Sequence, residues 1–234
     1  MFVASVQALQ RSMFPVFAIK PAPGNQTNVG VVGSAFFVNA DGYFVTAAHV
    51  MADAAASYQY FGRLPDDLVQ PSRVLIEVAH DTAADLFVGR VDVDHHQFAP
   101  VLKAQVPLGR SVMIAGYPLP IIALNAAGGL ELGGVRRYFQ PTFVLDRVNA
   151  TINSPSGPIT HVGFLARDVG LFGMSGGPIV DPDGHVVGVQ ASVTDRRVST
   201  NPDGREISVE NAIAIGSEVV ANFLASHGVA VPDP

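Results

Sequence analysis

A serine stands among glycines in residues 173–178 (GMSGGP), directly before the apolar residues Ile179 and Val180. The small neighbours of Ser175 allow another backbone to approach its hydroxyl closely. A turn of this kind can also direct the backbone amides of Gly173 and Ser175 toward one point, as an oxyanion hole requires. Alone, the stretch fits a glycine-rich surface turn equally well, because short motifs often match by chance.

Attack by a serine requires a base that removes the hydroxyl proton, and His49 is our candidate for this role. It follows the small residues 46–48 (TAA) at the end of an apolar run, which leaves room around an imidazole. The remaining histidines fit ordinary, satisfied core or surface positions: His80, His95, His96, His161, His185 and His227. The neighbouring pair His95 and His96 has no third residue at the spacing of a metal site.

The base in turn needs a carboxylate that holds its tautomer and stabilises the imidazolium, and Asp85 is our candidate. It stands directly before the apolar run 86–88 (LFV), and few structural roles need an acid at the start of a buried strand. A strand-initiating aspartate is the alternative interpretation. Asp81, Asp92 and Asp94 are rival candidates for the same role.

The elements that must position these residues are predicted to be short strands. Runs rich in Val, Ile and Phe alternate with Gly, Pro, Asn and Asp, as in VGVVGSAFFV, GYFVTAAHV, SVMIAGYP and HVVGVQASV. Many short strands of this type are typical of a sandwich or a barrel. Tight turns are predicted at residues 39–42, 181–184 and 201–204, each of which ends in Asp-Gly.

Helices are predicted only near the two ends of the chain. Apolar residues recur at helical spacing from Phe2 to Met13, and Pro15 ends that pattern. Near the other end, Ser217 is predicted to cap a helix that Gly228 closes. The sequence therefore predicts an all-β protein with a short helix at each end.

A polar stretch with two prolines, from His95 to Pro107, divides the strands into two sets of similar size. We expect residues 1–103 to carry His49 and Asp85, and residues 104–234 to carry Ser175. The tail after Gly228 (VAVPDP) has the composition of a linker. We therefore expect fusion to, or regulation by, another domain.

The composition excludes several function classes. With 234 residues and 48% hydrophobic content, the chain is long enough for one large core or two small ones. A net charge of -6 argues against nucleic acid or a membrane surface as a partner, since both require a basic face. The absence of cysteine excludes disulfides and thiolate chemistry. The first residues lack the features of a signal peptide, so we expect a cytoplasmic protein.

Three blocks of the sequence resemble those of a known family. GSAFFVNADGYFVTAAHV, ADLFVGRVD and GMSGGPIVDPDGHVVGV are similar, in this order, to the histidine, aspartate and serine blocks of trypsin-like peptidases. The resemblance is closest to the HtrA-type branch, without a PDZ domain, and covers roughly residues 16–226. It implies a chymotrypsin-like fold of two packed six-stranded antiparallel β-barrels, with the base and acid in the first and the nucleophile in the second.

The resemblance also implies a function and a set of site residues. We expect a serine endopeptidase that hydrolyses polypeptides through an acyl-enzyme on Ser175, with His49 and Asp85 completing the triad. The backbone amides of Gly173 and Ser175 would form the oxyanion hole. We expect neither a cofactor nor a metal ion to take part.

Position 174 departs from a family pattern, and four further positions would shape the specificity pocket. Chymotrypsin-like enzymes made as zymogens have an aspartate before the nucleophile, where this chain has Met174, so we expect no activation by an ion pair with a new N-terminus. The base of the specificity pocket would be Val169, and its wall the residues Ala191, Ser192 and Val193. These side chains favour cleavage after small to medium aliphatic residues.

Two alternatives remain open at this point. The stretch around Ser175 also matches the G-x-S-x-G elbow of α/β-hydrolases, but that fold places its histidine after the serine, where only His185 and His227 stand. The second alternative is a catalytically silent module of the same fold that binds peptides or a partner. An intact triad argues against this second alternative.

Overall fold

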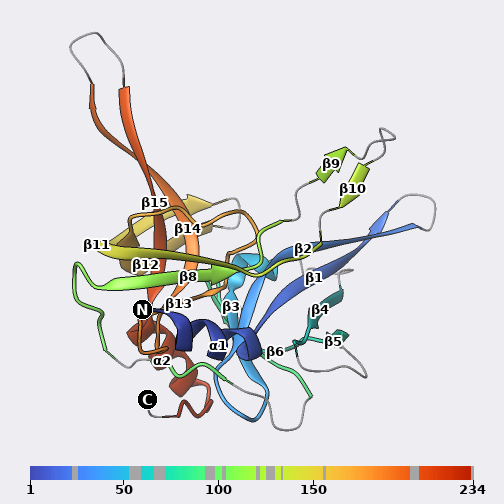
Figure 1. Ribbon diagram of the computed structural model, residues 1–234. Helices are drawn as coiled ribbons and strands as arrows, with labels where there is room; N and C mark the ends of the chain where they lie inside the picture. The colour runs from blue at the N-terminus through green and yellow to red at the C-terminus, as the bar shows by residue number, and fades with distance from the viewer. Residues whose placement is uncertain are drawn as a thin grey trace.

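The computed structural model describes residues 1–22, 26–52, 59–65, 72–92, 98–101, 104–119, 122–124, 130–132, 134–154, 157–200 and 206–232. The remaining residues, among them His95, His96, Asp94 and the predicted turn at 201–204, lie outside this part. Two β-structures built from successive halves of the chain lie side by side (Figure 1).

The first β-structure is an antiparallel sheet in the order β5-β4-β1-β2-β3-β7-β6. Its strands are β1 (Met13–Ala22), β2 (Gln26–Phe37), β3 (Tyr43–Ala47), β4 (Gln59–Arg63), β5 (Ser72–Val74), β6 (Ile76–Asp81) and β7 (Leu86–Arg90). Strands β5 and β6 form the two edges of the sheet, yet only Leu75 separates them in the chain. The chain itself therefore closes the sheet, and β5 and β6 act as one strand of a six-stranded barrel.

The second β-structure is a closed antiparallel barrel in the order β11-β12-β15-β14-β13-β8. Its strands are β8 (Ser111–Gly116), β11 (Tyr138–Ser154), β12 (Gly157–Ala166), β13 (Pro178–Val180), β14 (Val186–Thr200) and β15 (Glu206–Gly216). The hairpin of β14 and β15 extends well beyond the barrel, and β9 (Ile122–Leu124) pairs separately with β10 (Leu130–Leu132) (Figure 1). The predicted fold of two six-stranded barrels is confirmed.

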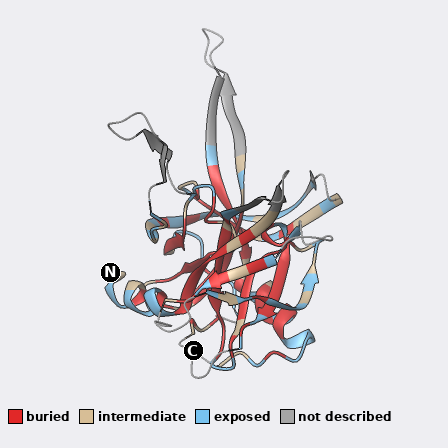
Figure 2. Ribbon diagram, turned by 90° about the vertical axis from the view of Figure 1, so that its right-hand side faces the viewer, coloured by how far each residue is buried: buried red, intermediate tan, exposed pale blue. Residues whose placement is uncertain are grey.

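Strand residues are buried on both faces because each barrel has its own core and a third core lies between the barrels. On β3, Phe44 points into the first barrel and Val45 points into the core between the barrels. On β8, Ile114 points into the second barrel while Met113 points into the shared core. Successive side chains of a strand point to opposite faces, so both sets are apolar here. This explains the continuous apolar runs of the sequence and the buried centre in Figure 2.

The two helices cover one end of the shared core. They are α1 (Val3–Ser12), which contributes Leu9, and α2 (Ser217–Ser226), which contributes Phe223 and Leu224. Both termini lie on this side of the molecule (Figures 1 and 2). Neither helix, nor any other in the described ranges, is long and apolar enough to cross a bilayer.

The ends of α2 differ in part from the prediction. Its N-cap is Gly216 rather than Ser217, whose hydroxyl instead donates to the carbonyl of Ala104 at 3.3 Å. The predicted closure at Gly228 is confirmed, because this residue has a φ of 70° and its amide donates to the carbonyl of Ala225. A left-handed conformation of this kind favours glycine.

The residues after α2 pack against the first barrel, although their composition suggested a linker. Val229 is 3% exposed and belongs to the shared core. The side-chain amide of Asn39 donates to the carbonyl of Ala230 at 2.9 Å. Asn39 also accepts from the amides of Asp41 and Tyr43, which forms the predicted turn between β2 and β3.

The predicted turn at residues 181–184 joins β13 to β14 and depends on the buried Asp181. One carboxylate oxygen of Asp181 accepts from the amides of Asp183 and His185, at 3.0 and 3.1 Å. The other oxygen accepts from Arg110 at 3.2 Å. The carbonyl of Asp181 accepts from the hydroxyl of Ser5, so the same residue fastens α1 to the second barrel.

Replacing Asp181 by alanine should therefore lower the free energy of unfolding by about 2 kcal/mol, because the amides of Asp183 and His185 lose the acceptor that this buried carboxylate provides. Asp183→Ala is the matched control: its side chain is 67% exposed and bonds only Arg110 among the described residues. The control should cost less than about 1 kcal/mol, as exposed ion pairs do. Urea unfolding measures both values, and equal losses in the two variants would contradict the role given to Asp181.

Candidate active site

His49 is held by Asp85 at the edge of the shared core. It lies in a single 3-10 turn (Ala48–Val50) that follows β3. Its Nδ1 lies 3.0 and 2.9 Å from the two carboxylate oxygens of Asp85, and its backbone amide donates to Oδ1 at 2.9 Å. The side chain of His49 is 40% exposed and that of Asp85 only 3%. The carboxylate thus fixes the ring from behind and leaves Nε2 available to take a proton.

The turn before β7 places the Asp85 carboxylate. Asp85 is the one described residue other than glycine with a positive φ, at 57°, a conformation that aspartate tolerates better than most residues. Its carbonyl accepts from the amide of Ala48 at 3.0 Å. The rival Asp81 has a different role, since its carboxylate accepts from the amides of Ala83 and Ala84 and shapes this turn. The rival Asp92 is exposed.

The loop that carries Ser175 leaves two amides free. The amides of Met174, Gly176 and Gly177 donate to backbone carbonyls at 3.0, 2.7 and 2.9 Å. Within the described residues, those of Gly173 and Ser175 donate to none. The carbonyl of Phe172 accepts from the amide of Leu119, and the two ends of a trans peptide point in opposite directions. The Gly173 amide therefore points away from Leu119 and has no acceptor among the described residues, as an oxyanion hole requires.

Two of the glycines in this loop are required by their surroundings. Gly173 has a φ of 90°, and a Cβ there would lie 2.6 Å from the carbonyl oxygen of Tyr117. Gly176 has a φ of 80°, and its Cβ would lie 2.0 Å from the hydroxyl of Thr46. Gly176 therefore lies directly against Thr46 of β3, which stands three residues before His49.

Ser34, a fully buried residue of β2, fastens the same loop to the first barrel. Its amide donates to the carbonyl of Ser175 at 2.8 Å, and its hydroxyl donates to the carbonyl of Gly173 at 2.8 Å. The hydroxyl also accepts from the amide of Tyr117, and the carbonyl of Ser34 accepts from the hydroxyl of Thr46. Nothing in the sequence had distinguished this serine from its small neighbours.

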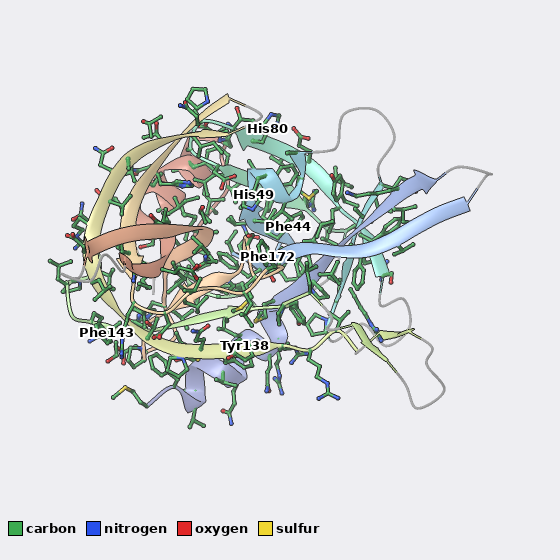
Figure 3. The ribbon with its side chains drawn as sticks, turned by 90° about the horizontal axis from the view of Figure 1, so that it is seen from above. Phe44, His49, His80, Tyr138, Phe143 and Phe172 are labelled. Carbon is green, nitrogen blue, oxygen red and sulfur yellow. The ribbon has the colours of Figure 1, made fainter. Side chains whose placement is uncertain are left out.

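Gly33 brings the segments of His49 and Ser175 together. A Cβ at Gly33 would lie 2.5 Å from a methyl group of Val50 and 3.0 Å from the carbonyl oxygen of Ser175. The residue after His49 and the carbonyl of Ser175 thus meet at one glycine. Figure 3 shows His49, and Phe172 from the serine loop, between the two β-structures.

Met174 fills the position where zymogens of this type have an aspartate. Its side chain is fully buried in the core of the second barrel. It lies so close to Gly116 that a Cβ there would be 2.8 Å from the Met174 Cβ. The amide of Leu171 also donates to its sulfur at 3.4 Å. An apolar anchor therefore holds the residue before Ser175.

The residues predicted to form a specificity pocket adjoin the serine loop. Gln190 exchanges backbone hydrogen bonds with Gly176 and Gly177, which places Ala191, Ser192 and Val193 directly beyond Ser175. Gly170, the neighbour of Val169, lies against the Gln190 side chain, because a Cβ there would be 2.8 Å from the Gln190 Cδ. The predicted base and wall of the pocket are thus adjacent.

Most other histidines have the ordinary surroundings expected of them. His80 bonds Glu77 at 2.7 Å, His185 lies near Asp181, and His227 contacts the carbonyl of Phe223. His161 differs, because it is 1% exposed and neither ring nitrogen has a hydrogen-bond partner in the described chain. Burial lowers the pKa of His161, Asp85 opposes this effect and His49 adds to it. Its sequence context did not distinguish it from the satisfied histidines.

Replacing Ser34 by alanine should slow the reaction of Ser175 with a fluorophosphonate on the order of tenfold, because Gly173 and Tyr117 lose a buried partner. Ser12→Ala is the matched control, as this buried residue's hydroxyl bonds the carbonyl of Ala8 within α1 and no other group of the described residues. The control should leave the labelling rate constant unchanged. Equal rate constants for wild type and a folded Ser34→Ala variant would refute the positioning role of Ser34.

Comparison with known proteins gives a consistent picture. The family model of the trypsin-like peptidase domain matches residues 33–189. The chain is 25% identical over 211 residues to a probable periplasmic serine endoprotease DegP-like from Ectopseudomonas mendocina, covering 88% of this chain and 38% of that protein. It is 30% identical over 162 residues to the mitochondrial serine protease HTRA2 of Bos taurus, covering 67% and 30%.

Two further matches concern a protein without a described function and a solved structure. The uncharacterized protein y4bJ of Sinorhizobium fredii is 30% identical over 213 residues, or 89% of this chain and 29% of that protein. The chain thus spans about a third of the length of these curated relatives. The crystal structure of the Rv3671c protease from M. tuberculosis in its active form matches with a TM-score of 0.65 at 21% identity, covering 98% of this chain and 86% of that one.

The prediction of a cytoplasmic protein is wrong, because the DegP-like relative from Ectopseudomonas mendocina and two further matches, from Pseudomonas putida and Rhizobium meliloti, are each described as a probable periplasmic endoprotease. It rested on the first twenty residues, which form α1 and most of β1 and so belong to the folded domain. Their sequence reflects packing and carries no information on location. The fold, the match over residues 33–189 and the protease relatives agree. The chain belongs to the trypsin-like peptidase family.

Proposed function

We propose that this peptidase hydrolyses polypeptides through an acyl-enzyme on Ser175, with His49 as general base and Asp85 orienting the histidine. The observation that carries the proposal is the pattern of amides around the serine. The amides of Met174, Gly176 and Gly177 donate to backbone carbonyls, whereas those of Gly173 and Ser175 have no acceptor among the described residues. The amides of Gly173 and Ser175, on either side of Met174, suit donation to the oxyanion that forms when the Ser175 hydroxyl attacks a carbonyl.

Each step of the proposed reaction uses a group with matching surroundings. His49 takes the hydroxyl proton of Ser175 on Nε2 as the oxygen attacks the peptide carbonyl. The imidazolium that forms is stabilised by the buried carboxylate of Asp85, which already contacts Nδ1. His49 then protonates the leaving amine, and a water molecule deprotonated by the same ring releases the acyl group.

The proposed enzyme needs no cleavage at its N-terminus to order the serine loop. Met174 offers no charge to a new amino group, and its burial in the second barrel supports the loop instead. In the same arrangement, the amide of Gly173 has no acceptor among the described residues. These features support a serine loop that is ordered without such a cleavage.

The substrate class follows from the pocket residues. Val169 at the proposed base offers no carboxylate to a basic side chain. Val193 on the proposed wall adds bulk and is 43% exposed. Cleavage after small to medium aliphatic residues is therefore the proposed preference.

The relatives suggest a wider context for the domain. This chain spans only 29% and 38% of the length of two of them, so we propose that the peptidase works beside, or is regulated by, further domains. The periplasmic relatives suggest an extracytoplasmic location. Within the chain, we propose residues 1–103 and 104–234 as the two halves of one peptidase domain.

Fluorophosphonate labelling tests the nucleophile. Wild type should be labelled and Ser175→Ala should not, because only an activated serine reacts. Labelling that persists in Ser175→Ala would refute the assignment. A folded wild type that is neither labelled nor active on unfolded polypeptides would instead favour a silent peptide-binding module.

Asp85→Asn tests the orienting carboxylate. This variant should lower kcat on the order of 10⁴-fold, since the amide favours the wrong histidine tautomer. Asp92→Asn, at an exposed aspartate of the same barrel, should leave kcat unchanged. A peptide hydrolysis assay measures kcat of both variants. A small loss in Asp85→Asn would show that another acid orients His49.

A peptide library tests the proposed preference. Wild type should cleave mainly after small and medium aliphatic residues. Val169→Asp should shift cleavage toward Arg and Lys, because it adds a carboxylate at the base, whereas Val193→Gly should admit larger apolar side chains. Cleavage by wild type mainly after Arg or Lys would contradict the assigned pocket.

A further inference from the structure

His161 lies where the second barrel touches the turn that carries Asp85. It belongs to β12, and the preceding residue, Thr160, donates its amide to the carbonyl of Ala83 at 2.6 Å. Ala83 stands two residues before Asp85. The next residue, Val162, is 42% exposed, and neighbouring side chains of a strand point to opposite faces. Phe164 and Ala166, on the same face of β12 as Val162, point into the second barrel. The ring of His161 therefore points out of that barrel, toward the turn of the first barrel that carries Asp85.

Apolar packing alone does not explain why the polar ring of His161 is buried. His161 is 1% exposed, and both ring nitrogens are buried without a partner in the described part of the chain. A neutral imidazole always has one N–H donor and one acceptor. Burying both without hydrogen bonds destabilises a protein, so a native structure that does so needs a reason.

Two charged groups act on the ring, and both belong to the proposed triad. Burial lowers the pKa of His161 below its usual value; the carboxylate of Asp85 opposes this effect and His49 adds to it. Burial therefore favours a neutral ring that does not compete with His49 as a second cation. The carboxylate of Asp85 has accepting capacity to spare, because only the amide and Nδ1 of His49 contact it in the described chain.

We propose that His161 is a positioning residue: in the working enzyme its ring N–H donates to the carboxylate of Asp85 and holds that carboxylate on His49. The proposal rests on the roles proposed above for Asp85 and His49. A residue of the second barrel would thus help to position Asp85, whereas Asp85 and His49 themselves belong to the first barrel. The contact between Thr160 and Ala83 supplies the alignment for it.

Kinetics of two His161 variants test the role. His161→Leu should lower kcat on the order of tenfold, with KM within about twofold, because a hydrogen bond to a charged group is lost away from the substrate. His161→Gln should recover most of this loss, because its amide can donate. His80→Leu is the control, since His80 is exposed and bonds Glu77, and it should leave kcat unchanged.

Nitrogen-15 NMR of the histidine rings tests the contact without relying on activity. The protonated ring nitrogen of His161 should show a hydrogen-bonded signal that shifts in Asp85→Asn and stays in place in Asp92→Asn. This comparison also decides the matter if His161→Leu does not fold. A ring signal that ignores Asp85→Asn, or an unchanged kcat in a folded His161→Leu, would overturn the proposal. Failure of the proposed function appears separately, as labelling that survives Ser175→Ala.

Discussion

Ser34 joins the two barrels through hydrogen bonds that occupy its amide, its hydroxyl and its carbonyl. Two of its partners, the carbonyls of Gly173 and Ser175, belong to the loop of the proposed nucleophile. A third partner, Thr46, lies on the strand that leads to His49. The relative position of nucleophile and base, which come from different barrels, thus depends on one fully buried serine. Its backbone is closely packed as well, because a Cβ at Gly176 would lie 2.4 Å from the carbonyl oxygen of Ser34.

The apolar core between the barrels gives these hydrogen bonds their strength. The shared core draws side chains from both barrels and both helices, so water is excluded behind the site. In such surroundings an unmatched polar group is costly, and alternative arrangements of the loop are disfavoured. Asp85 benefits from the same shielding: its carboxylate is almost fully buried, while the ring it holds reaches the surface. The serine loop and His49 are thus each held on a side that excludes water, and each is open to solvent on the other side.

Much of this arrangement could be predicted from the sequence, because its signals are local. The glycines around Ser175, the small residues before His49 and the apolar run after Asp85 each mark a boundary of a strand, and the structure has strands at all three places. Ser34 and His161 carry no such signal. Their importance comes from residues more than 70 positions away in the chain, such as Gly173 for Ser34 and the turn before Asp85 for His161. Only the pairing of the barrels reveals them, and the N-terminal residues likewise showed how they pack but not where the protein resides.

Met174 has a consequence for the conditions under which the serine loop keeps its shape. An ion pair that orders such a loop weakens as salt screens it and disappears when either partner changes its protonation. A thioether side chain packed in the core of a barrel has neither dependence, because burial of apolar surface does not respond to charge. The loop should therefore persist across wide ranges of ionic strength and acidity, and should lose its order together with the barrel when heat unfolds the protein.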